Sequence, residues 1–597
     1  MKWKSLLFLC FVTNFATAQI SVSGNNYIFA TTSINATDVY LFVEDDVNLE
    51  NTNSYFYLRN NAQLLQGTGS TGNSGVGQLS AYQTGTVNNY AYNYWCAPVG
   101  NTDADDNANR AFRPSNNIYD ETSAPITSAL ATYTSGHNGT SGPMVISNRW
   151  LYTYSPGLAY SEWDYMSDSG TAGAGYGFSM KGSTSGAQLY DFRGKPNNGT
   201  ISTNVQTGDW TLVGNPYPSA LDALDYIHDT QNQTSINGSL YFWEHDASVN
   251  SHFVADYVGG YASYTINAAG TVETYTDATF DTYNGDGSLN TTGGTRTSPK
   301  TARRYIPIGQ GFMIIGTANS TARTQNSHRQ YYKQTDVDSE FFRTGDSKKK
   351  KKPVDKTPDD IVYDDNGLQV LPNEYKRFRL NIDFNEVYTR QILQNFHHTA
   401  TDGFDYGLEI ESPEGVNSDA HWILNNKPYV AQAFNFDNDL KIPLVVKVND
   451  ENKLIRFRIF DVQNFNPNQS IYLHDIVTDV YIDLTEENYE LNLEVGEYTN
   501  RFEVTFVNNE DLATESAPLV IYQNNTESKL TISNPNSLNI NDIVLYDISG
   551  KQIFHHEDLV TNTKHEFSTQ GLSSGVYLAS IKINKSTINK KVLINNK

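Results

Sequence analysis

The stretch Ile455-Arg-Phe-Arg-Ile-Phe460 decides the fold class of this chain. Apolar and charged side chains alternate along it, with Ile455, Phe457 and Ile459 on one side. Side chains of a strand point to opposite faces with this period of two. The stretch therefore predicts a strand of an antiparallel sheet that has one face against a core and one face in water.

The same period extends outward from this stretch in both directions. Further segments of this kind, bounded by Gly, Asn, Asp, Ser or Thr, are Val39-Tyr-Leu-Phe-Val43, Tyr55-Phe-Tyr-Leu58, Phe378-Arg-Leu-Asn-Ile-Asp383, Leu440-Lys-Ile-Pro-Leu-Val-Val-Lys-Val448 and Phe502-Glu-Val-Thr-Phe-Val507. Helical periodicity is confined to short pieces, of which Ala220–Asp229, with Ser219 as its expected N-cap, is the best. These patterns predict an all-β protein of tandem β-sandwich domains.

Composition excludes several function classes. The 597 residues include 66 acidic and 42 basic residues, which gives a net charge of −24. A nucleic-acid-binding protein would need a large basic surface instead. The mean hydropathy of −0.51 excludes a polytopic membrane protein. Aromatic residues make up 12% of the chain, which is enough to build substantial cores and excludes wholesale disorder.

The first 18 residues have the pattern of a secretory signal peptide. Lys2 and Lys4 precede the apolar run Leu6–Val12, and Ala16-Thr-Ala18 then precedes Gln19. A short apolar run followed by two small residues, Ala16 and Ala18, predicts cleavage before Gln19. No run of 18 apolar residues follows the signal, so we expect an exported chain without a transmembrane segment.

Export would leave Cys96 as the only cysteine. An intramolecular disulfide is then impossible, and the setting Tyr94-Trp-Cys-Ala-Pro98 favours a small buried hydrophobic side chain over a reactive thiol.

Changes in composition divide the chain into segments. Five consecutive lysines at 348–352 predict a solvated linker, with a local anchor to acidic polysaccharide or lipid as the alternative. The expected segments are a signal peptide (1–18), an N-terminal β-rich segment (19–80), a Gly- and aromatic-rich β region (81–345), a Lys-rich linker (346–359), a β-sandwich (360–510), a second linker (511–518) and a small seven-strand sandwich (519–597).

The region 81–345 suggests a degenerate duplication of about 81–205 and 206–345. Three pairs of motifs occur in the same order in both halves. They are Trp95-Cys-Ala-Pro-Val-Gly100 with Trp210-Thr-Leu-Val-Gly214, Arg149-Trp-Leu-Tyr-Thr-Tyr154 with Leu240-Tyr-Phe-Trp-Glu-His245, and Gly175-Tyr-Gly-Phe-Ser-Met-Lys-Gly182 with Gly309-Gln-Gly-Phe-Met-Ile-Ile-Gly316.

The last 80 residues carry a second set of motifs. Short strands are expected at Leu530-Thr-Ile532, Ile543-Val-Leu-Tyr-Asp547, Gln552-Ile-Phe554, Gly575-Val-Tyr-Leu-Ala-Ser-Ile581 and Lys591-Val-Leu-Ile594, with a turn at Ser549-Gly-Lys551. In the order and spacing of Ile543–Lys551, Leu572–Leu578 and Asn589–Ile594, this segment resembles the type A C-terminal sorting domain of the Bacteroidota type IX secretion system. Its opening, Ile532-Ser-Asn-Pro535, departs from the usual Tyr-Pro-Asn-Pro.

The resemblance implies export first to the periplasm and then across the outer membrane. It implies recognition of residues 519–597 by the type IX translocon, and release of the cargo or its attachment to an anionic lipopolysaccharide afterwards. The sorting-signal residues expected from it are Gly550 and Lys551 in a turn, Gly575, Val576, Tyr577 and Leu578 at the start of a core strand, and Lys590 and Lys591 flanking the last strand.

The body also resembles uncharacterised flavobacterial surface proteins of this export class. The residues concerned are Asn93-Tyr-Trp-Cys-Ala-Pro-Val-Gly100, Leu212-Val-Gly-Asn-Pro-Tyr-Pro-Ser219, Thr401-Asp-Gly-Phe-Asp-Tyr-Gly407, Tyr472-Leu-His-Asp475 and Tyr498-Thr-Asn-Arg-Phe502. This resemblance supplies a location and no chemistry.

A search for catalytic motifs gives no recognisable constellation. Gly182-Ser-Thr-Ser-Gly186 has Thr184 where a nucleophile elbow has serine, and no H-E-x-x-H motif occurs. His397 and His398 are adjacent, so on a strand they point to opposite faces and do not share one ion. We therefore expect no catalytic residues and no bound cofactor other than calcium.

Calcium is the one cofactor for which oxygen ligands are suitably spaced. Asp103, Asp105 and Asn107 repeat every second residue, and Asp402 and Asp405 flank Gly403 in a tight turn. The glycine and the final bidentate glutamate of an EF-hand are missing from both segments. Solvated turns held by side-chain hydrogen bonds explain the same pattern.

Aromatic density indicates the function class. Five tryptophans (Trp95, Trp150, Trp163, Trp210 and Trp243) lie within 81–345, and exposed aromatic rings stack on sugars, although they also fill cores. The leading hypothesis is a non-enzymatic secreted or surface protein for adhesion or glycan binding. The alternatives are a secreted polysaccharide hydrolase with paired carboxylates in a cleft, and a structural component of a surface or gliding apparatus.

Overall fold

The structure is a computed structural model. It describes residues 19–32, 39–68, 72–85, 88–104, 106–183, 188–246, 249–282, 300–334, 338–342, 361–385, 387–413, 416–449, 453–508, 519–534, 539–559, 561–583 and 586–595. The expected signal peptide with Ala16 and Ala18, the two linkers at 346–359 and 511–518, and the calcium candidate Asp105 lie outside the described residues.

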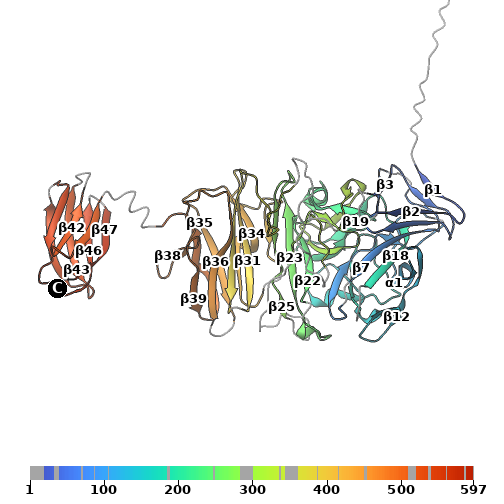
Figure 1. Ribbon diagram of the computed structural model, residues 1–597, viewed down its shortest axis with the longest axis horizontal. Coiled ribbons are helices and arrows are strands. Elements are labelled where there is room, and N and C mark those ends of the chain that lie inside the picture. The colour runs from blue at the N-terminus through green and yellow to red at the C-terminus, as the bar shows by residue number, and fades with distance from the viewer. Residues whose placement is uncertain are drawn as a thin grey trace, which may run out of the picture. The chain divides into compact units, whose positions relative to one another are not determined.

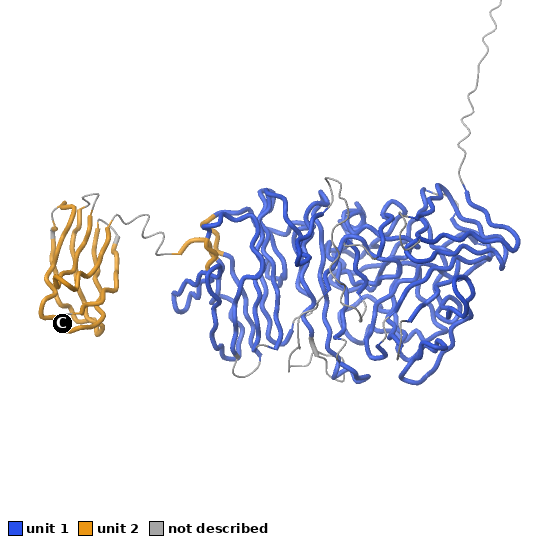
Figure 2. The backbone as a smooth tube through the Cα atoms, in the orientation of Figure 1, with its two compact units in different colours: residues 1–437, 442–469, 473–504 blue, residues 438–441, 470–472, 505–597 orange. Residues whose placement is uncertain are grey.

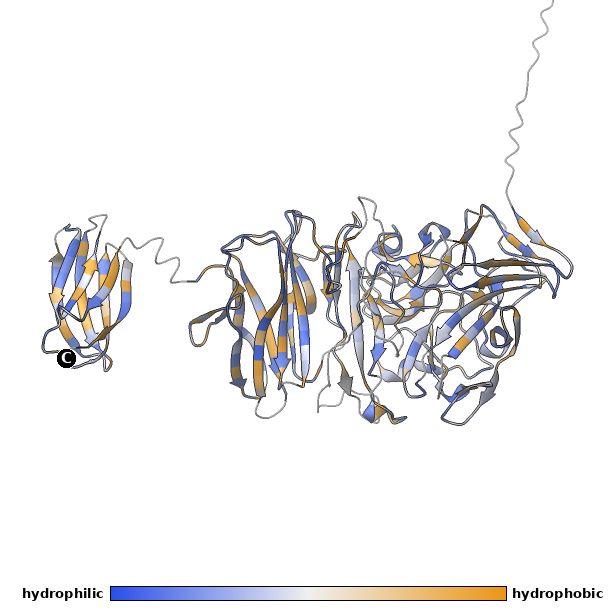
Figure 3. Cartoon of the chain, viewed as in Figure 1, coloured by the Kyte–Doolittle hydropathy of each residue, from blue (hydrophilic) through white to orange (hydrophobic). Residues whose placement is uncertain are grey.

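The described chain is almost entirely β-structure, as the sequence predicts (Figure 1). Apolar and polar residues alternate in bands along many strands (Figure 3). The chain forms two compact units, of which the first holds nearly all residues up to 504 and the second holds mainly 505–597 (Figure 2). Among the residues that the structure describes, no helix has the length and apolar character that crossing a membrane requires.

The N-terminal segment winds into a short parallel solenoid. The first coil consists of β1 (Ile20–Val22), β2 (Tyr27–Thr31) and β3 (Tyr40–Val43), and the second of β4 (Val47–Leu49), β5 (Tyr55–Arg59) and β6 (Gln63–Gln66). Each strand of the first coil pairs in parallel with its counterpart in the second. β5 then pairs in parallel with β7 (Gln78–Gly85), so that β2 and β5 of the solenoid belong to the same sheet as β7.

A seven-stranded sheet continues from the solenoid. β7 pairs with β18 (Gln188–Pro196), and β18 pairs with β10 (Ile118–Ser123). A separate four-stranded sheet contains β8 (Tyr92–Trp95), β15 (Tyr152–Tyr154), β16 (Trp163–Tyr165) and β17 (Phe178–Lys181). One apolar core extends from the solenoid to the buried face of this second sheet, where Trp95 and Phe178 contribute to it.

The two halves of 81–345 share a strand plan. In the first half β8 pairs with β17, which pairs with β15, and β7 pairs with β18. In the second half β20 (Trp210–Gly214) pairs with β27 (Gly311–Ile315), which pairs with β22 (Leu240–His245). In the second half, β19 (Ile201–Val205) pairs with β28 (Ser320–Thr324), as β7 pairs with β18 in the first half. Common descent of the halves stays a prediction.

The registers correct one detail of the motif match. Trp95 lies opposite Phe178, whereas Val213 lies opposite Phe312. The position of Trp95 is thus taken by Val213 in the second half, three residues after Trp210. The sequence match fails here because it aligned the two tryptophans with each other. In the structure, the residue that lies opposite the phenylalanine of the Gly-x-Gly-Phe motif is Trp95 in the first half and Val213 in the second.

The two halves also exchange backbone contacts reciprocally. Trp95 bridges Gln310 of the second half, and Val213 bridges Tyr176 of the first. A Cβ built on Gly214 would lie 2.4 Å from the Cβ of Cys96 and 2.4 Å from the carbonyl oxygen of Gln310. Glycine is therefore required where the two halves cross.

Residues 376–505 form an eleven-stranded sheet. Its central strands are β30 (Lys376–Phe384), β31 (Tyr388–Phe396), β34 (Lys427–Phe434) and β36 (Lys453–Gln463). Ile455 and Phe457 are fully buried as expected, and the Arg458 guanidinium pairs with Asp383 at 2.7 Å. The sequence predicts a purely antiparallel sheet here, but β31 and β34 are parallel.

The strand β30 is buried on both faces. Phe378 and Leu380 face the sheet's own core, while Arg377 and Arg379 on the other face are also inaccessible to water. Arg379 donates to the carbonyl of Tyr275 in β24 (Glu273–Thr276) at 2.7 Å. The polar face of this strand thus packs against the preceding region instead of facing solvent.

The one helix expected from sequence starts later than its pattern indicates. Ala220–Asp222 is strand β21, and the helix α2 spans Ala223–Ile227. Its N-cap is Asp222, whose carboxylate accepts from the backbone N–H of Leu224 at 2.9 Å. Ser219 is not the cap, because its buried hydroxyl accepts a hydrogen bond from Arg329.

The second unit is the seven-strand sandwich that the sequence predicts. One sheet contains β41 (Val520–Asn524), β42 (Lys529–Ser533) and β45 (Lys564–Ser568). The other contains β44 (Gln552–Leu559), β43 (Ile540–Asp547), β46 (Gly575–Ile583) and β47 (Ser586–Ile594) in that order. Its apolar core is built only from residues of this segment.

Candidate binding face and sorting domain

Strand registers place a set of aromatic side chains on one face of the four-stranded sheet. Tyr152 lies opposite Tyr165, and Tyr154 lies opposite Trp163. Tyr152 also lies opposite Ser179, which is opposite Tyr94. Because directly opposed residues share a face of a sheet, six rings lie together. We call Tyr92, Tyr94, Tyr152, Tyr154, Trp163 and Tyr165 the aromatic face.

The rings of the aromatic face contact one another. The centroid of Trp163 is 5.0 Å from that of Tyr154 and 5.5 Å from that of Tyr94. Tyr152 and Tyr165 are 5.5 Å apart. The hydroxyl of Tyr94 lies 3.0 Å from that of Tyr261 in the second half, which links the face to the rings around Trp210. These contacts hold the rings in fixed orientations.

Only part of the aromatic face is buried. Tyr165 is 58% exposed, and Tyr152, Tyr154 and Trp163 are half-buried. The loop between β15 and β16 adds Leu158 and Tyr160, with exposed fractions of 70% and 51%. The face therefore presents ring surface to solvent at its outer strand and is closed by packing at its inner strand.

Lys181 lies at the buried end of the same face, opposite Tyr92. Its ammonium nitrogen lies 3.8 Å from the ring centroid of Trp150, and it contacts the rings of Tyr92 and Tyr257 as well. It donates to the hydroxyl of Tyr257 and lies 3.3 Å from Nδ1 of His252. Burial lowers the pKa of Lys181 to about 7, whereas the three rings favour its charged form.

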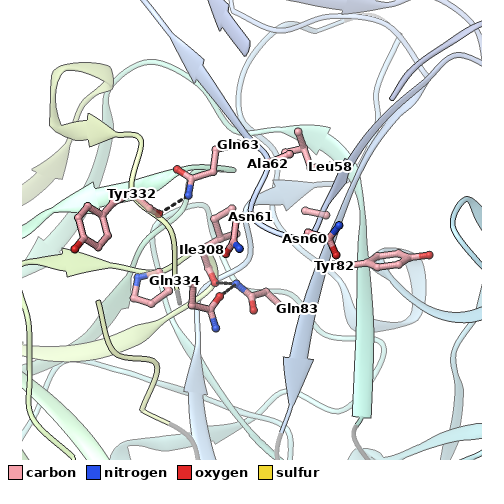
Figure 4. A pocket seen from close by; sticks show the side chains of 12 residues that line it. Leu58, Asn60, Asn61, Ala62, Gln63, Tyr82, Gln83, Ile308, Tyr332 and Gln334 are labelled. Atoms are coloured by element: carbon pink, nitrogen blue, oxygen red, sulfur yellow. Dashed lines mark hydrogen bonds between the residues drawn. The ribbon is translucent and has the colours of Figure 1, made fainter. Parts of the chain in front are cut away.

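A small pocket is lined by other residues than those of the aromatic face (Figure 4). Its lining includes Asn61, Gln63, Gln83 and Tyr332, and it contains no Asp or Glu. Gln83 donates to the carbonyl of Ile308 at 2.7 Å and thereby closes one side. The accessible volume of about 20 Å³ holds little more than a water molecule.

Burial raises the pKa values of five described carboxyl groups, which are Asp225, Glu244, Glu273, Asp277 and Glu409, and none of them lines this pocket. Burial raises the pKa of Glu244 to about 7 and that of Glu409 to about 8. Glu409 accepts from the backbone N–H of Asp405 at 2.8 Å.

The expected calcium ligands make other contacts. Asp103 pairs with the Arg110 guanidinium at 2.6 Å, and the same guanidinium is 2.7 Å from Asp106. Asn107 is exposed nearby. No group of three or more His, Cys, Asp or Glu residues arranged for a metal occurs in the described ranges. The arginine already supplies positive charge to this carboxylate pair.

The second candidate turn is held by hydrogen bonds of its own. Asp405 accepts from the backbone N–H of Thr401 at 2.6 Å, while Asp402 is exposed beside it. Calcium at either turn stays a prediction.

The expected sorting residues fall into two places in the second unit. Gly550 has φ of +80° in the turn between β43 and β44, and the backbone N–H of Lys551 donates to the carboxylate of Asp547 at 3.0 Å. Gly575 begins β46 as expected, and the buried Tyr577 donates to the carbonyl of Ser573. Lys590 and Lys591 lie within the last strand, not beside it, because that strand begins at Ser586.

Several of these residues share one exposed surface of the sandwich. Val576 lies opposite Leu593, and Leu578 lies opposite Lys591, on the edge pair β46 and β47. Val576 and Leu593 are 45% and 62% exposed. Apolar side chains thus remain uncovered beside lysines on an edge strand, a position at which other chains can dock.

Sequence reasoning predicted the strand at Val39–Val43 but missed the solenoid to which it belongs, and it missed the position of Lys181. The coils differ in length, since Ile20 pairs with Val47 but Tyr40 pairs with Gln63, so they produce no fixed repeat. Lys181 follows Phe-Ser-Met in an ordinary strand pattern. The pairs of aromatic residues in β8, β15 and β16 indicate a possible aromatic cluster, but the sequence does not show that they share a face with Lys181, because this depends on the strand register.

Together the two units define the class of this protein, an all-β body followed by a small β-sandwich that carries its own core. Comparison with known families identifies both parts. Residues 16–506 match the family described as a domain of unknown function, DUF8693, so the chain belongs to this family. Residues 520–595 match the secretion system C-terminal sorting domain, which confirms the resemblance seen in the sequence.

The protein is therefore a type IX secretion substrate that is secreted or displayed at the cell surface. No curated protein matches the chain. Among solved structures, one described as "Biofilm associated protein - BSP domain" is 9% identical, covering 86% of this chain and 98% of that chain with a TM-score of 0.12.

Proposed function

We propose that this exported protein is a non-enzymatic adhesin that binds glycans through the aromatic face. The observation that carries the proposal is the combination of fixed and accessible rings. Tyr165 and Tyr160 are more than half exposed, and Trp163 is held between Tyr154 and Tyr94. Rings that are already ordered lose little entropy when a sugar stacks on them.

The polar atoms around the face suit a saccharide. The hydroxyls of Tyr152 and Tyr165, and the carboxylate of the half-buried Glu162, provide donors and acceptors beside the rings. A sugar ring presents apolar C–H groups on one side and hydroxyls at its rim, so it matches a ring surface bordered by such groups. The small pocket without carboxylates gives no comparable support to a hydrolase.

The proposal is tested by measuring glycan binding to the chain from Gln19 onward, first on an array and then by calorimetry with the glycan found. Trp163→Ala and Tyr165→Ala should each weaken binding about tenfold, which corresponds to about 1.4 kcal/mol. Tyr165→Phe keeps the ring and should retain most of the affinity.

Phe460→Ala serves as the matched control, because Phe460 is a 49% exposed aromatic residue on β36 and belongs to a different sheet. Binding that survives both substitutions in the aromatic face, or that Phe460→Ala reduces equally, would contradict the proposal. Release of reducing sugar from the bound glycan would instead favour the hydrolase.

A further inference from the structure

The first coil of the solenoid is an open end. β1, β2 and β3 each pair on one side only, with β4, β5 and β6. Within the described residues no strand pairs with their other side, and the three strands lie at the periphery of the first unit (Figure 1). An uncovered strand edge presents unpaired backbone N–H and C=O groups that can pair with another chain.

The interior of this coil is also incompletely covered. Ile28 lies in register with Phe56 of the second coil, and Leu41 with Leu64. Phe56 and Leu64 are fully buried, whereas Ile28 and Leu41 are only half-buried although they face the same core. The loss of burial from one coil to the next shows that the apolar interior reaches the surface at this end.

The outward side chains of the coil are apolar as well. Tyr27 is 56% exposed and Phe29 is 37% exposed on β2, and Phe42 is 53% exposed on β3. Solenoids normally need a polar cap at each end to stay soluble. This end combines apolar outer residues, an apolar interior and an unpaired edge.

The lack of charge on these strands favours a second copy of this chain as the occupant. Residues 19–32 and 39–43 contain no Asp, Glu, Lys, Arg or Pro, although the whole chain carries a net charge of −24 and the acidic residues Asp38 and Glu44 directly adjoin the second range. Edge strands that stay unpaired are usually protected by charges, and the strands of the open end carry none. Two molecules of net negative charge repel each other least where the contacting surface is uncharged, and the open end supplies such a surface on both copies.

We propose that two copies of this protein associate through their open solenoid ends. The β2 strands pair in antiparallel fashion about a two-fold axis, with Phe29 facing Phe29 of the partner copy and Tyr27 facing its Thr31. A strand that pairs with itself in this way satisfies its backbone groups in both copies. The contact covers Ile28 and Leu41 and continues both the interior and the outer aromatic row into the second molecule.

The test is the mass of the chain from Gln19 onward in solution, measured by light scattering and sedimentation from about 1 to 100 µM. We expect twice the monomer mass at the upper concentrations and dissociation on dilution. Phe29→Lys places two ammonium groups together on the axis and should weaken the association at least about a hundredfold. Phe460→Lys, on an equally accessible ring of β36, should leave the dimer intact.

A cross-link gives a second readout that does not depend on affinity. Residues directly opposite in an antiparallel pair bring their Cβ atoms within about 5.5 Å, so Phe29→Cys should form a disulfide-linked dimer on mild oxidation. Cys96 is buried and does not compete. Phe460→Cys should stay monomeric under the same conditions.

Three results would overturn the proposal. They are a monomer at all concentrations, a dimer that Phe29→Lys leaves unchanged, and a properly folded Phe29→Cys variant that fails to cross-link. Thermal melting of each variant shows that the fold is retained, which is expected because Phe29 is partly exposed.

Discussion

The thiol of Cys96 and the amine of Lys181 illustrate how burial changes the chemistry of single residues in this protein. Cys96 is 1% exposed and lies against Gly214 at the crossing of the two halves. Burial raises the pKa of its thiol well above the ordinary value, which removes the reactive thiolate at neutral pH. The sequence predicts this burial, since the surrounding Tyr94, Trp95 and Pro98 leave no polar neighbour for a reactive sulfur.

We predict that native Cys96 does not react with iodoacetamide at pH 8. The same protein in guanidinium chloride should take up one equivalent per exported chain, because unfolding restores access and an ordinary pKa. Mass spectrometry counts the modified residues. Stoichiometric labelling of the native protein would show that the crossing of the halves opens in solution.

Lys181 makes stability depend on pH in a defined window. The folded amine loses its proton near pH 7, whereas an unfolded lysine holds it up to about pH 10.5. Between these values the unfolded state binds more protons, so the free energy of unfolding contributed by this residue rises with pH. Below pH 7 both states are protonated and the dependence disappears.

We predict that the unfolding free energy of the original chain, minus that of Lys181→Met, increases by about 1 kcal/mol for each pH unit between 7 and 9. Denaturant titrations at several pH values measure the difference. Lys427→Met, which alters an exposed lysine, should give a constant difference. A constant difference for Lys181→Met too would mean that the surrounding rings keep its ammonium charged across this window.

At the scale of elements, the crossing between the two halves of 81–345 tolerates no side chain at Gly214. An added methyl group would meet Cys96 and the backbone of Gln310, and backbone cannot rotate away as a side chain can. We predict that Gly214→Ala lowers the free energy of unfolding by about 3 kcal/mol or more, measured by denaturant titration.

Gly496→Ala is the matched control, because the added Cβ in β40 (Gly496–Thr505) would have its nearest neighbour at 3.9 Å. It should change stability by less than about 1 kcal/mol. Equal effects at the two glycines would show that loss of backbone freedom, and not contact between the halves, controls both.

Sequence patterns predict where the strands of this chain lie better than they predict which other elements pack against those strands. The alternation along Ile455–Phe460 indicates a strand, and Ile455 and Phe457 are indeed buried. The same pattern at Phe378–Asp383 predicts a wet face that does not exist, because Arg379 packs against Tyr275 from a strand about 100 residues earlier. Period two shows that two faces differ and does not show what covers either of them.

The candidate site shows the same limit. The sequence identifies a dense set of aromatic residues but cannot say which share a surface. Trp163 and Tyr154 come together because β15 and β16 pair in one register, and a shift by one residue would turn each ring to the other face. The sorting domain could be predicted more fully, since its motifs lie close together within 80 residues.

For the whole molecule, the separate core of residues 519–597 determines how the body and tail behave. The apolar residues of that core all come from the tail itself, so we expect it to fold and unfold independently of the body. Deletion of 519–597 should therefore leave the melting temperature of the body within about 2 °C of its value in the full chain.

The same deletion should abolish surface display and leave the body in the periplasm, because the tail is the part that the type IX machinery recognises. Fractionation and surface labelling distinguish the two locations. Normal display of the truncated chain would show that export depends on the body, and a large drop in melting temperature would show that the tail has a structural role.

The reciprocal bridges of Trp95 with Gln310 and of Val213 with Tyr176 have a mechanical consequence. Each half of 81–345 supplies backbone hydrogen bonds that hold a strand end of the other half. A pull on one half, as flowing liquid exerts on a protein attached to a cell, is therefore resisted by both. The two halves should yield together in a single rupture rather than unravel one after the other.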